Sequence, residues 1–368
     1  MKIINVMLLV LLLYGVTSCA DHNKPNQTVF VFQGMSDASA AVALSRNMFI
    51  VADDENNVLR VYKVDGNSAP VFSYDLTSFL GIAAEHPEAD IEGATMVGER
   101  IYWITSHGRN NEGKMRPNRY RFFATSVKVK DQHINIEPAG TPCRTLVHEL
   151  IRTESMRKLD LQRATQFSAT NLKGKERAKL APKKQGLNIE GLCASPDGRT
   201  IYIGFRNPRP RNVATGREQS LVVALNNPSQ VIEKAEAPIF SEPILWDLGD
   251  LGIRGMEYSH FYEAYFIVAG PHDEQLRFAL YRWSGKKDTP PILVRELDTD
   301  QSKFAPEALV AFDNSSSFWL LSDDGSLSID VSDASECMKG KLLKGRKCLN
   351  KHLTCPSKKC FRGMWLKP

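Results

Sequence analysis

Residues 186–209 read GLNIEGLCASPDGRTIYIGFRNPR and contain the unit from which the fold can be predicted. A short apolar strand carries one carboxylate, Glu190, and runs into a turn at residues 196–198. Turn residues between two β-rich runs are typical of a hairpin, because glycine can adopt positive φ and aspartate can bond its own backbone. A second apolar strand over residues 201–205 then ends at arginines. The stretch therefore predicts a β-hairpin with charged groups at its open end.

The same unit recurs along the chain. An acidic residue beside a short strand is followed by an apolar second strand in five places, and these acidic residues are Asp37, Glu92, Glu190, Glu257 and Glu307. The second strands start roughly 50 to 65 residues apart, with one interval of about 100, and such spacing is typical of β-propeller blades. We therefore predict an all-β protein, a β-propeller of five or six blades over residues 28–368. At 42% hydrophobic content, one such domain uses nearly the whole chain.

One segment does not fit the blade pattern. Residues 145–185 begin with apolar side chains at roughly helical spacing, from Leu146 to Ile151, and continue as a polar stretch rich in lysine and arginine. We predict a basic, partly helical insertion on one face of the propeller. It could act as a lid over the channel mouth, as an arm that contacts an anionic surface, or as a solvated loop without a ligand.

The two ends of the chain are predicted to close the propeller. An open propeller would leave sheet edges exposed, and residues 29–32 and 361–366 are both β-rich. We therefore expect these two segments to pair, so that both ends of the chain complete one blade.

The C-terminal tail, residues 337–360, is rich in cysteine and lysine. In an oxidising compartment its four cysteines predict two disulfides in one of three pairings, and they are Cys337, Cys348, Cys355 and Cys360. Zinc is the competing interpretation, but the spacing lacks the paired C-x-x-C of structural zinc sites. Two further cysteines, Cys143 and Cys193, are interpreted as a loop thiol and a core thiol. The basic tail could also contact phospholipid or lipopolysaccharide.

The amino terminus predicts export. Lys2 precedes an apolar run over residues 6–13 that is too short to span a bilayer, and Val-Thr-Ser leads directly to Cys19. This resembles a bacterial lipoprotein signal over residues 1–18, followed by a lipidated Cys19 and a polar tether in residues 19–27. Acyl chains would anchor the protein to a membrane, since each buried methylene contributes about 0.8 kcal/mol. We expect an exported protein, either an outer-membrane-anchored lipoprotein or one in the periplasm or on the cell surface; an ordinary cleaved secretory signal is the alternative.

Composition argues against nucleic acid as a partner. The formal net charge of +5 is modest for 368 residues and is unevenly spread along the chain. We expect no nucleic-acid binding, a membrane contact through lipid on Cys19, and a small anionic ligand. The sequence sets no oligomeric state.

Chemistry is expected where the repeated units converge. The first strand of every propeller blade lines the central channel, so one carboxylate per unit would meet there, from Asp37, Glu92, Glu190, Glu257 and Glu307. Carboxylates at close quarters need cations or arginines to stay ionised, and oxygen-rich sites favour calcium or magnesium. His107 and several arginines lie near the same strand ends, and these arginines are Arg109, Arg119, Arg206, Arg209 and Arg254. A ring of carboxylates that only braces neighbouring blades is the structural alternative.

Several long motifs occur in the order of a known family. They are SDASAAVAL with VADDENNVLRVY, DIEGA with IYWITSHGRN and RPNRYRFFAT, NIEGL with PDGRTIYIGFRNPR, and RGMEY. Together they resemble an uncharacterised bacterial family of exported propeller proteins, a domain of unknown function. The resemblance runs from Val29 to Leu327 and includes the closing FRGMWL strand. It implies the propeller fold and no established activity, and the insertion and the four-cysteine tail lie outside the family's usual pattern.

The stretch NIEGLCASPDGRTIY is similar, more distantly, to the E-G-L-x-x-x-P-D-G-R signature of phytase-like propellers associated with esterase activity. That similarity implies a divalent cation, calcium or magnesium, held by the channel carboxylates and activating water against an ester or phosphoryl group. Glu92, Glu190 and His107 would be the catalytic residues, and the five arginines would bind the anionic substrate.

Two functions are therefore predicted as alternatives. The first is a divalent-cation-dependent hydrolase of an anionic phosphate or carboxylic ester at the central channel. The second is a non-catalytic envelope propeller that binds a partner protein, a polymer or a small anion. Whether the channel carboxylates hold a cation beside open coordination positions is what distinguishes the two.

Overall fold

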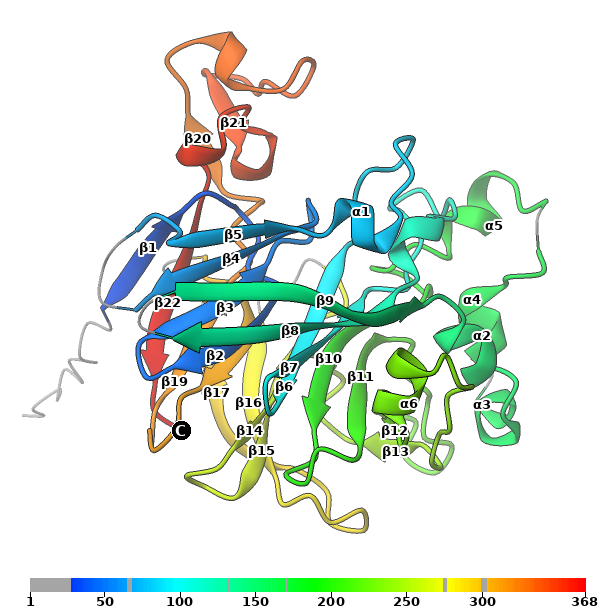
Figure 1. Cartoon of the computed structure of the whole chain (residues 1–368). Helices are drawn as coiled ribbons and strands as arrows, with labels where there is room; N and C mark the ends of the chain where they lie inside the picture. Colours follow the sequence, from blue (N-terminus) through cyan, green and yellow to red (C-terminus); the bar gives the residue numbers. More distant parts are fainter. Residues whose placement is uncertain are drawn as a thin grey trace, which may run out of the picture.

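The computed structural model describes residues 28–64, 68–130, 133–159, 161–169, 171–273, 277–298 and 303–368 (Figure 1). The predictions made for the signal segment, for Cys19 and for the tether lie outside these residues. Five four-stranded antiparallel sheets form the body of the molecule. The predicted all-β propeller is confirmed, with five blades. None of the helices in the described part of the chain is long and apolar enough to cross a membrane.

Four blades are contiguous in sequence, and they are numbered 1 to 4 in chain order. Blade 1 consists of β2 (Ala40–Ser45), β3 (Met48–Ala52), β4 (Val58–Lys63) and β5 (Phe72–Asp75). Blade 2 consists of β6 (Ile91–Val97), β7 (Arg100–Thr105), β8 (Phe122–Lys130) and β9 (His133–Cys143). Blade 3 consists of β10 (Asn188–Ala194), β11 (Ile201–Asn207), β12 (Ser220–Leu225) and β13 (Ile244–Trp246). Blade 4 consists of β14 (Gly252–Ser259), β15 (Ala264–Gly270), β16 (Phe278–Trp283) and β17 (Ile292–Leu297).

Blade 5 is assembled from both ends of the chain. Its strands are β18 (Pro306–Ala311), β19 (Phe318–Ser322), β22 (Cys360–Leu366) and β1 (Val29–Gln33). The strand β22 lies between β19 and β1, and its register with β1 pairs Val29 with Met364 and Phe32 with Phe361. The predicted pairing of the two chain ends is therefore confirmed.

The first strand of each blade lies at the centre of the propeller. β2, β6, β10, β14 and β18 contact one another in a closed ring, so these strands surround the axis. All residues of β10 and nearly all of β11 are buried, because neighbouring blades cover both faces of the inner strands. Outer strands such as β17 are mostly exposed. This explains why the inner strands read as continuous apolar runs rather than as alternating patterns.

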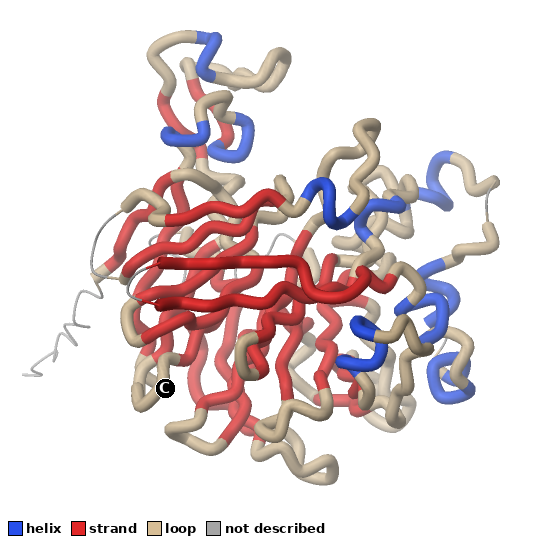
Figure 2. The backbone as a smooth tube through the Cα atoms, viewed as in Figure 1, coloured by secondary structure: helices blue, strands red, loops and turns tan. Residues whose placement is uncertain are grey.

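Helices are short and lie beside the sheets (Figure 2). Four of them, α2 (Leu146–Leu150), α3 (Glu154–Lys158), α4 (Leu161–Thr165) and α5 (Gly174–Ala178), lie in the insertion between β9 and β10. Leu146, Val147 and Leu150 pack into the core shared by blades 2 and 3, which is why the first turn is helical and apolar. The remaining helical segments are α1 (Thr77–Leu80), α6 (Pro228–Glu233), η1 (Pro117–Arg119), η2 (Ala334–Glu336), η3 (Asn350–His352) and η4 (Pro356–Lys358).

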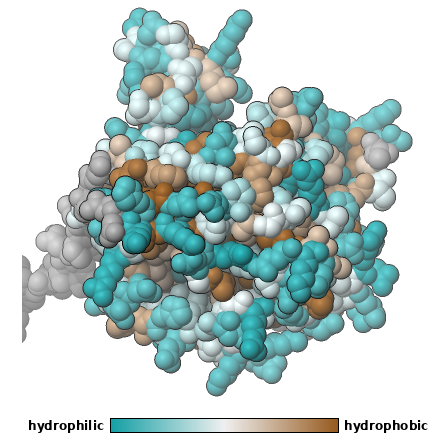
Figure 3. Space-filling model, viewed as in Figure 1, coloured by the Kyte–Doolittle hydropathy of each residue, from teal (hydrophilic) through white to brown (hydrophobic). Residues whose placement is uncertain are grey.

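Residues 328–359 form a small module between β19 and β22, called the tail module below. It contains a two-stranded sheet of β20 (Ser328–Asp330) and β21 (Lys347–Leu349) and a small core that includes Val331 and Leu353. The module projects from one end of the propeller and presents mostly hydrophilic residues in the view of Figure 3.

One disulfide, Cys337–Cys348, closes the tail module. The prediction of a second one is wrong, because Cys355 and Cys360 are both free. The Sγ of Cys355 lies 3.1 Å from the Oγ of Ser357, and Cys360 is held in blade 5, where its backbone N–H donates to Asn350. Since two of the four cysteines are bonded to each other, these four form no zinc site. Cys193 is a buried thiol, as predicted, but Cys143 ends β9 and does not lie in a loop.

Candidate metal centre

The first strands of four blades carry an irregularity at the same point. In blade 2 the pairing with the second strand skips Glu92, and in blade 3 it skips Glu190. Blade 4 skips Arg254, and blade 5 skips Glu307 together with Ala308. A β-bulge leaves its extra residue out of the ladder and re-aims the side chain. The bulges thus bring four charged side chains together at one level of the channel, called the ring below.

A small residue follows each charged residue of the ring. A Cβ added at Gly255 would lie 2.3 Å from the carbonyl oxygen of Glu307 on the next blade, and one at Gly191 would lie 2.8 Å from the Cγ2 of Ile253. Glycine is therefore required where the first strands of neighbouring blades approach most closely. The sequence signature of the ring is a charged residue followed by glycine or alanine.

Replacing Gly255 by alanine tests this close approach. The new methyl group would meet backbone rather than a flexible side chain, so blades 4 and 5 would have to separate. We expect the free energy of unfolding to fall by about 1–3 kcal/mol, the usual cost of overpacking. Urea denaturation, monitored by circular dichroism, measures this free energy. A change within about 0.5 kcal/mol, as for an ordinary surface substitution, would show that the blades adjust freely.

Glu257 does not belong to the ring. The sequence predicts Glu257 there, but the structure places Arg254 at that position. The dipeptide Arg254-Gly255 of blade 4 is equivalent to the Glu-Gly dipeptides of blades 2 and 3. Glu257 lies three residues farther along β14, in regular register opposite Phe266. It belongs to none of the carboxylate groups whose oxygens converge in the described part of the chain. Blade 1 contributes the uncharged Ser39 at the same level.

Glu92, Glu190 and Glu307 form the carboxylate part of the ring. Ligand oxygens of all three lie within 4.8 Å of one another, and the residues are only 6%, 2% and 3% exposed. Glu92, Glu190 and Ser39 line a cavity of about 10 Å³, which has room for about one water molecule. Among the described residues, Oε2 of Glu92 and Oε2 of Glu307 have no hydrogen-bond partner. The oxygens of three buried carboxylates thus converge at one place in the channel.

Two arginines neutralise part of this charge. Arg254 places Nη2 2.6 Å from Glu307 and Nη1 3.1 Å from Glu190. Arg206 places Nη1 2.8 Å from Glu190 and donates Nε–H to the carbonyl of Pro271. No guanidinium of the described residues forms an ion pair with Glu92, and burial together with Glu190 raises its pKa well above the ordinary value. Burial also raises the pKa of Glu307, although Arg254 opposes it. The ring therefore contains more buried negative charge than its arginines neutralise.

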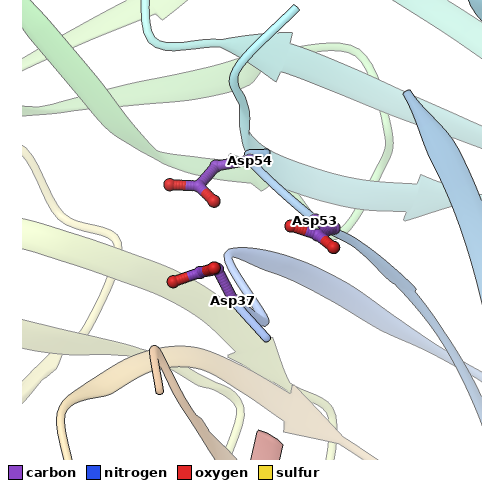
Figure 4. Close-up of side chains that lie close together, drawn as sticks. All are labelled: Asp37, Asp53 and Asp54. Atoms are coloured by element: carbon purple, nitrogen blue, oxygen red, sulfur yellow. The ribbon is translucent and has the colours of Figure 1, made fainter. Parts of the chain in front are cut away.

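A row of further carboxylates leads outward from the ring. Ligand oxygens of Asp54, Asp90 and Glu92 form a second group, and those of Asp37, Asp53 and Asp54 form a third. Figure 4 shows the third group, contributed by the turn before β2 and the turn after β3. Burial is the main cause that raises the pKa of Asp37, Asp54 and Asp90, and it raises the pKa of Asp53 to about 6. Asp54 and Glu92 are shared members, so the three groups form one continuous site.

Cationic side chains line the outer end of this row. Arg119 lies 2.9 Å from Asp90 and also pairs with Glu88. Lys351, from the tail module, lies 2.7 Å from Glu55. Burial tends to lower the pKa of Lys351, but Glu55 and Asp54 outweigh it and leave that pKa above its ordinary value. The tail module thus supplies a cation to the mouth of the acidic channel.

The predicted substrate-binding arginines are all engaged by the protein. Arg119, Arg206 and Arg254 pair with carboxylates as described above. Arg109 donates to the backbone carbonyls of Gly113, Thr165 and Gln166, which ties the insertion to blade 2. Arg209 lies 2.5 Å from Glu218 and 2.8 Å from the Nδ1 of His272. The structure therefore presents these groups as counter-ions and braces.

His107 faces the insertion. Its Nδ1 lies 2.8 Å from the carbonyl of Thr105, and its ring meets the ring of Tyr120 edge-on. Burial is the main cause that lowers the pKa of His107 to about 4, and Arg121 and His148 add to it. No carboxylate of the row is among the groups that set this pKa. The structure thus places His107 beside Tyr120, whose ring also contacts His148 and Phe167 of the insertion.

The donor set fits a hard divalent cation. Every converging ligand atom is a carboxylate oxygen, and calcium and magnesium prefer oxygen donors. The unpartnered oxygens of Glu92 and Glu307 are the positions a cation would satisfy. Asp53, Asp54 and Asp90 belong to this site but were not among the predicted ligands, although they flank the predicted strands. The signal was the pair Asp53-Asp54 directly after an apolar strand and Asp90 two residues before Glu92.

Asp53 should make the cation-free protein less stable as the pH rises. Its pKa is about 6 when folded against an ordinary value of 3.8, so its contribution is fully present below pH 3.8 and is lost as the pH rises towards 6. His107 acts oppositely, losing stability as the pH falls from 6.5 towards 4. The difference between wild type and Asp53→Asn isolates the carboxylate. We expect urea unfolding in the presence of chelator to show that the stability of the variant, relative to wild type, increases between pH 4 and pH 6. A difference in stability that does not depend on pH would contradict this.

Comparisons with known proteins show the family. A family model described as "Protein of unknown function (DUF3616)" matches residues 37–303, and no curated protein matches the chain. A putative oxidoreductase (glucose dehydrogenase) from Thermus thermophilus is 11% identical with a TM-score of 0.40, over 92% of this chain and 100% of that one. The PQQ-bound aldose sugar dehydrogenase from Streptomyces coelicolor is 10% identical with a TM-score of 0.37, over 93% and 99%.

A further solved structure, the hydrazine synthase of Kuenenia stuttgartiensis, is 9% identical with a TM-score of 0.34 over 82% of this chain. This chain spans 60% of that chain's length. At such identities and TM-scores these likenesses carry no information about the function of this chain.

Proposed function

This chain belongs to the DUF3616 family of proteins of unknown function, and we propose that it binds divalent cations in its central channel and uses them to hydrolyse an anionic ester. Membership confirms the predicted uncharacterised propeller family, while the likeness to phytase-like propellers stays a prediction. The observation that carries the proposal is the set of buried carboxylate oxygens without partners, on Glu92, Glu307 and Asp54. Burying an anionic group without a partner is costly, so an ion at this position would stabilise the fold.

The residues of the site divide into two roles. Glu92, Glu190 and Glu307 would hold the cation, and the guanidinium of Arg254 fixes the positions of Glu190 and Glu307. When bound, a divalent cation supplies a Lewis acid that polarises an ester or phosphoryl oxygen and lowers the pKa of bound water. Asp54 has its pKa raised by burial and lies beside Asp90 and Glu92, so it is positioned to accept a proton from an attacking water.

A non-catalytic role is the second candidate, and one observation favours it. All five arginines expected to bind an anionic substrate are engaged by protein groups, so the structure offers no free guanidinium clamp among them. An anion would then have to bind through the cation itself. The same site without turnover would make the protein a cation-dependent binder of a polymer, a partner protein or a small anion.

Thermal unfolding tests cation binding directly. The mature chain is stripped with chelator, dialysed, and melted across titrations of Ca²⁺, Mg²⁺ and Mn²⁺. At a cation concentration of about one hundred times the dissociation constant we expect roughly 2.7 kcal/mol of added stability. Glu92→Gln should abolish the shift, because it removes a ligand shared by two carboxylate groups. Glu257→Gln is the matched control, a channel glutamate outside the ring, and should keep the full shift.

Turnover is then measured on the cation-loaded protein with p-nitrophenyl phosphate, p-nitrophenyl acetate and a γ-lactone. Hydrolysis that needs the cation and is lost in Glu92→Gln supports the enzyme. A saturable shift without hydrolysis of any of them favours the non-catalytic binder. If no divalent ion shifts the melt, the carboxylates only brace the blades and both candidates fail.

We also propose that the protein is exported and anchored through lipid on Cys19 at the outer membrane, in the periplasm or on the cell surface. The disulfide Cys337–Cys348 supports an oxidising compartment. Mass spectrometry of the protein purified from membranes should find acyl chains on an amino-terminal Cys19, and Cys19→Ser should move the protein to the soluble fraction. An unmodified amino terminus elsewhere in the sequence would contradict this.

A further inference from the structure

The channel has a second mouth, at the opposite end from the row of carboxylates. A cavity of about 400 Å³ lies there, which is within the usual size range of small-molecule sites. Its walls come from the ends of the first strands and from the hairpin turns of all five blades, including Ser45, Gly98, Asp197, His260 and Asp313. The cavity is therefore a feature of the closed propeller rather than of one loop.

The wall of this cavity is acidic and, among the described residues, includes His260 but no lysine or arginine. Glu257, Asp197 and Asp313 line it. Arg199 approaches Asp197 only to 4.0 Å and is mostly in solvent. A hydrogen bond from Ser195 is the main cause that lowers the pKa of Asp197, so this carboxylate stays ionised. The field in the cavity favours a positive ligand.

Glu257 is the innermost acidic group of the cavity. It receives a hydrogen bond from the amide of Ala311. Burial raises its pKa, and no lysine or arginine contributes to setting that pKa. A carboxyl group in this position gains most from a ligand that brings its own positive charge.

The remaining wall is apolar and aromatic. Val42, Met96 and Ala194 line the cavity beside the ring of Tyr258. Tyr258 is held edge-on by Tyr265, with ring centroids 4.9 Å apart. Such a wall can bury a short hydrocarbon or ring, and an aromatic face also attracts a cation.

From this arrangement we infer that the second mouth binds a small organic amine, with its ammonium group at Glu257 and its apolar body against Val42, Met96 and Tyr258. The site is separate from the ring, because Glu257 belongs to none of the converging carboxylate groups of the described chain. The inference does not depend on the proposed cation-dependent function, and it stands if that function fails.

Isothermal titration calorimetry with benzylamine on the chelated mature chain tests the inference. We expect saturable one-to-one binding that weakens as salt rises, and benzyl alcohol, the neutral analogue of similar shape, should bind at least about tenfold more weakly. Glu257→Gln should lower the affinity for benzylamine by about tenfold or more and leave the affinity for benzyl alcohol unchanged. Asp313→Asn, at the exposed rim, should weaken benzylamine severalfold. Glu92→Gln is the matched control in the ring and should leave benzylamine binding unchanged.

Three results would each overturn the inference. They are no saturable binding of benzylamine, cyclohexylamine or choline; equal affinity for benzylamine and benzyl alcohol; and a Glu257→Gln protein that melts as wild type does but binds benzylamine as tightly. If Glu257→Gln does not fold, the affinity of Asp313→Asn for benzylamine and the comparison of benzylamine with benzyl alcohol test the inference instead.

Discussion

Deletion of residues 361–368 is expected to abolish cooperative folding. The deletion removes β22, the strand that lies between β1 and β19 in blade 5, so both neighbours lose their backbone partners. It also removes three buried side chains, Phe361, Met364 and Leu366. At about 1.5–3 kcal/mol each, these side chains alone approach the usual 5–15 kcal/mol stability of a domain. The remaining blades would be left as an open ring with exposed strand edges.

Circular dichroism during heating measures the effect, with wild type and the truncated chain under identical conditions. Deletion of residues 367 and 368 alone is the matched control, because they follow β22 and leave its pairing intact. The free energy of unfolding of the control should lie within about 0.5 kcal/mol of the wild-type value. A truncated chain with an unchanged melting temperature would show that blade 5 closes without its third strand.

The fold was predictable because its signals repeat. The hairpin turn at residues 196–198 and its counterparts mark the junction of first and second strands, and their spacing indicates blades. The pairing of residues 29–33 with 360–366 followed from the need to close the last sheet. The blade count stayed open between five and six, because the insertion before blade 3 lengthens one interval to that of about two blades.

The ring was only partly predictable. Glu92, Glu190 and Glu307 were identified because an acidic residue recurs beside each first strand. Arg254 was predicted to bind substrate rather than to belong to the ring. A search for repeated carboxylates does not find the equivalent position in blade 4, because that position is an arginine. The glycine after the charged residue was the better signal, since it reflects the close approach of neighbouring blades. Aligning on Gly93, Gly191 and Gly255 puts Arg254 in register with the glutamates.

Asp37 and Glu92, the two ends of the row, were predicted from the sequence, but the three aspartates between them were not. Asp54 follows the second strand of blade 1 and Asp90 precedes the first strand of blade 2, so their carboxylates meet only once the two blades are packed side by side. Lys351 reaches the same mouth from the tail module, almost three hundred residues from Glu55. The disulfide pairing was equally inaccessible, because three pairings were compatible with the spacing.

Replacement of Arg254 by methionine is expected to destabilise the cation-free protein by about 3–5 kcal/mol, the usual cost of breaking a buried ion pair. Arg254 contacts both Glu190 and Glu307, and methionine keeps its apolar stem while removing the charge. Arg295→Met, an exposed arginine on β17, is the matched control and should change the stability by no more than about 0.5 kcal/mol. Urea unfolding in chelator at pH 7.5 measures both.

Two further measurements separate a charge effect from lost packing. Without Arg254 the folded-state pKa of Glu307 rises further, so the variant's deficit should shrink as the pH falls towards 5. Only Arg206 would then neutralise the three carboxylates, through Glu190, so saturating Ca²⁺ should stabilise Arg254→Met more than wild type. A deficit that is independent of both pH and Ca²⁺ would mean that Arg254 contributes packing alone. A deficit that Ca²⁺ reduces would identify Arg254 as the internal cation of a site that a metal ion completes.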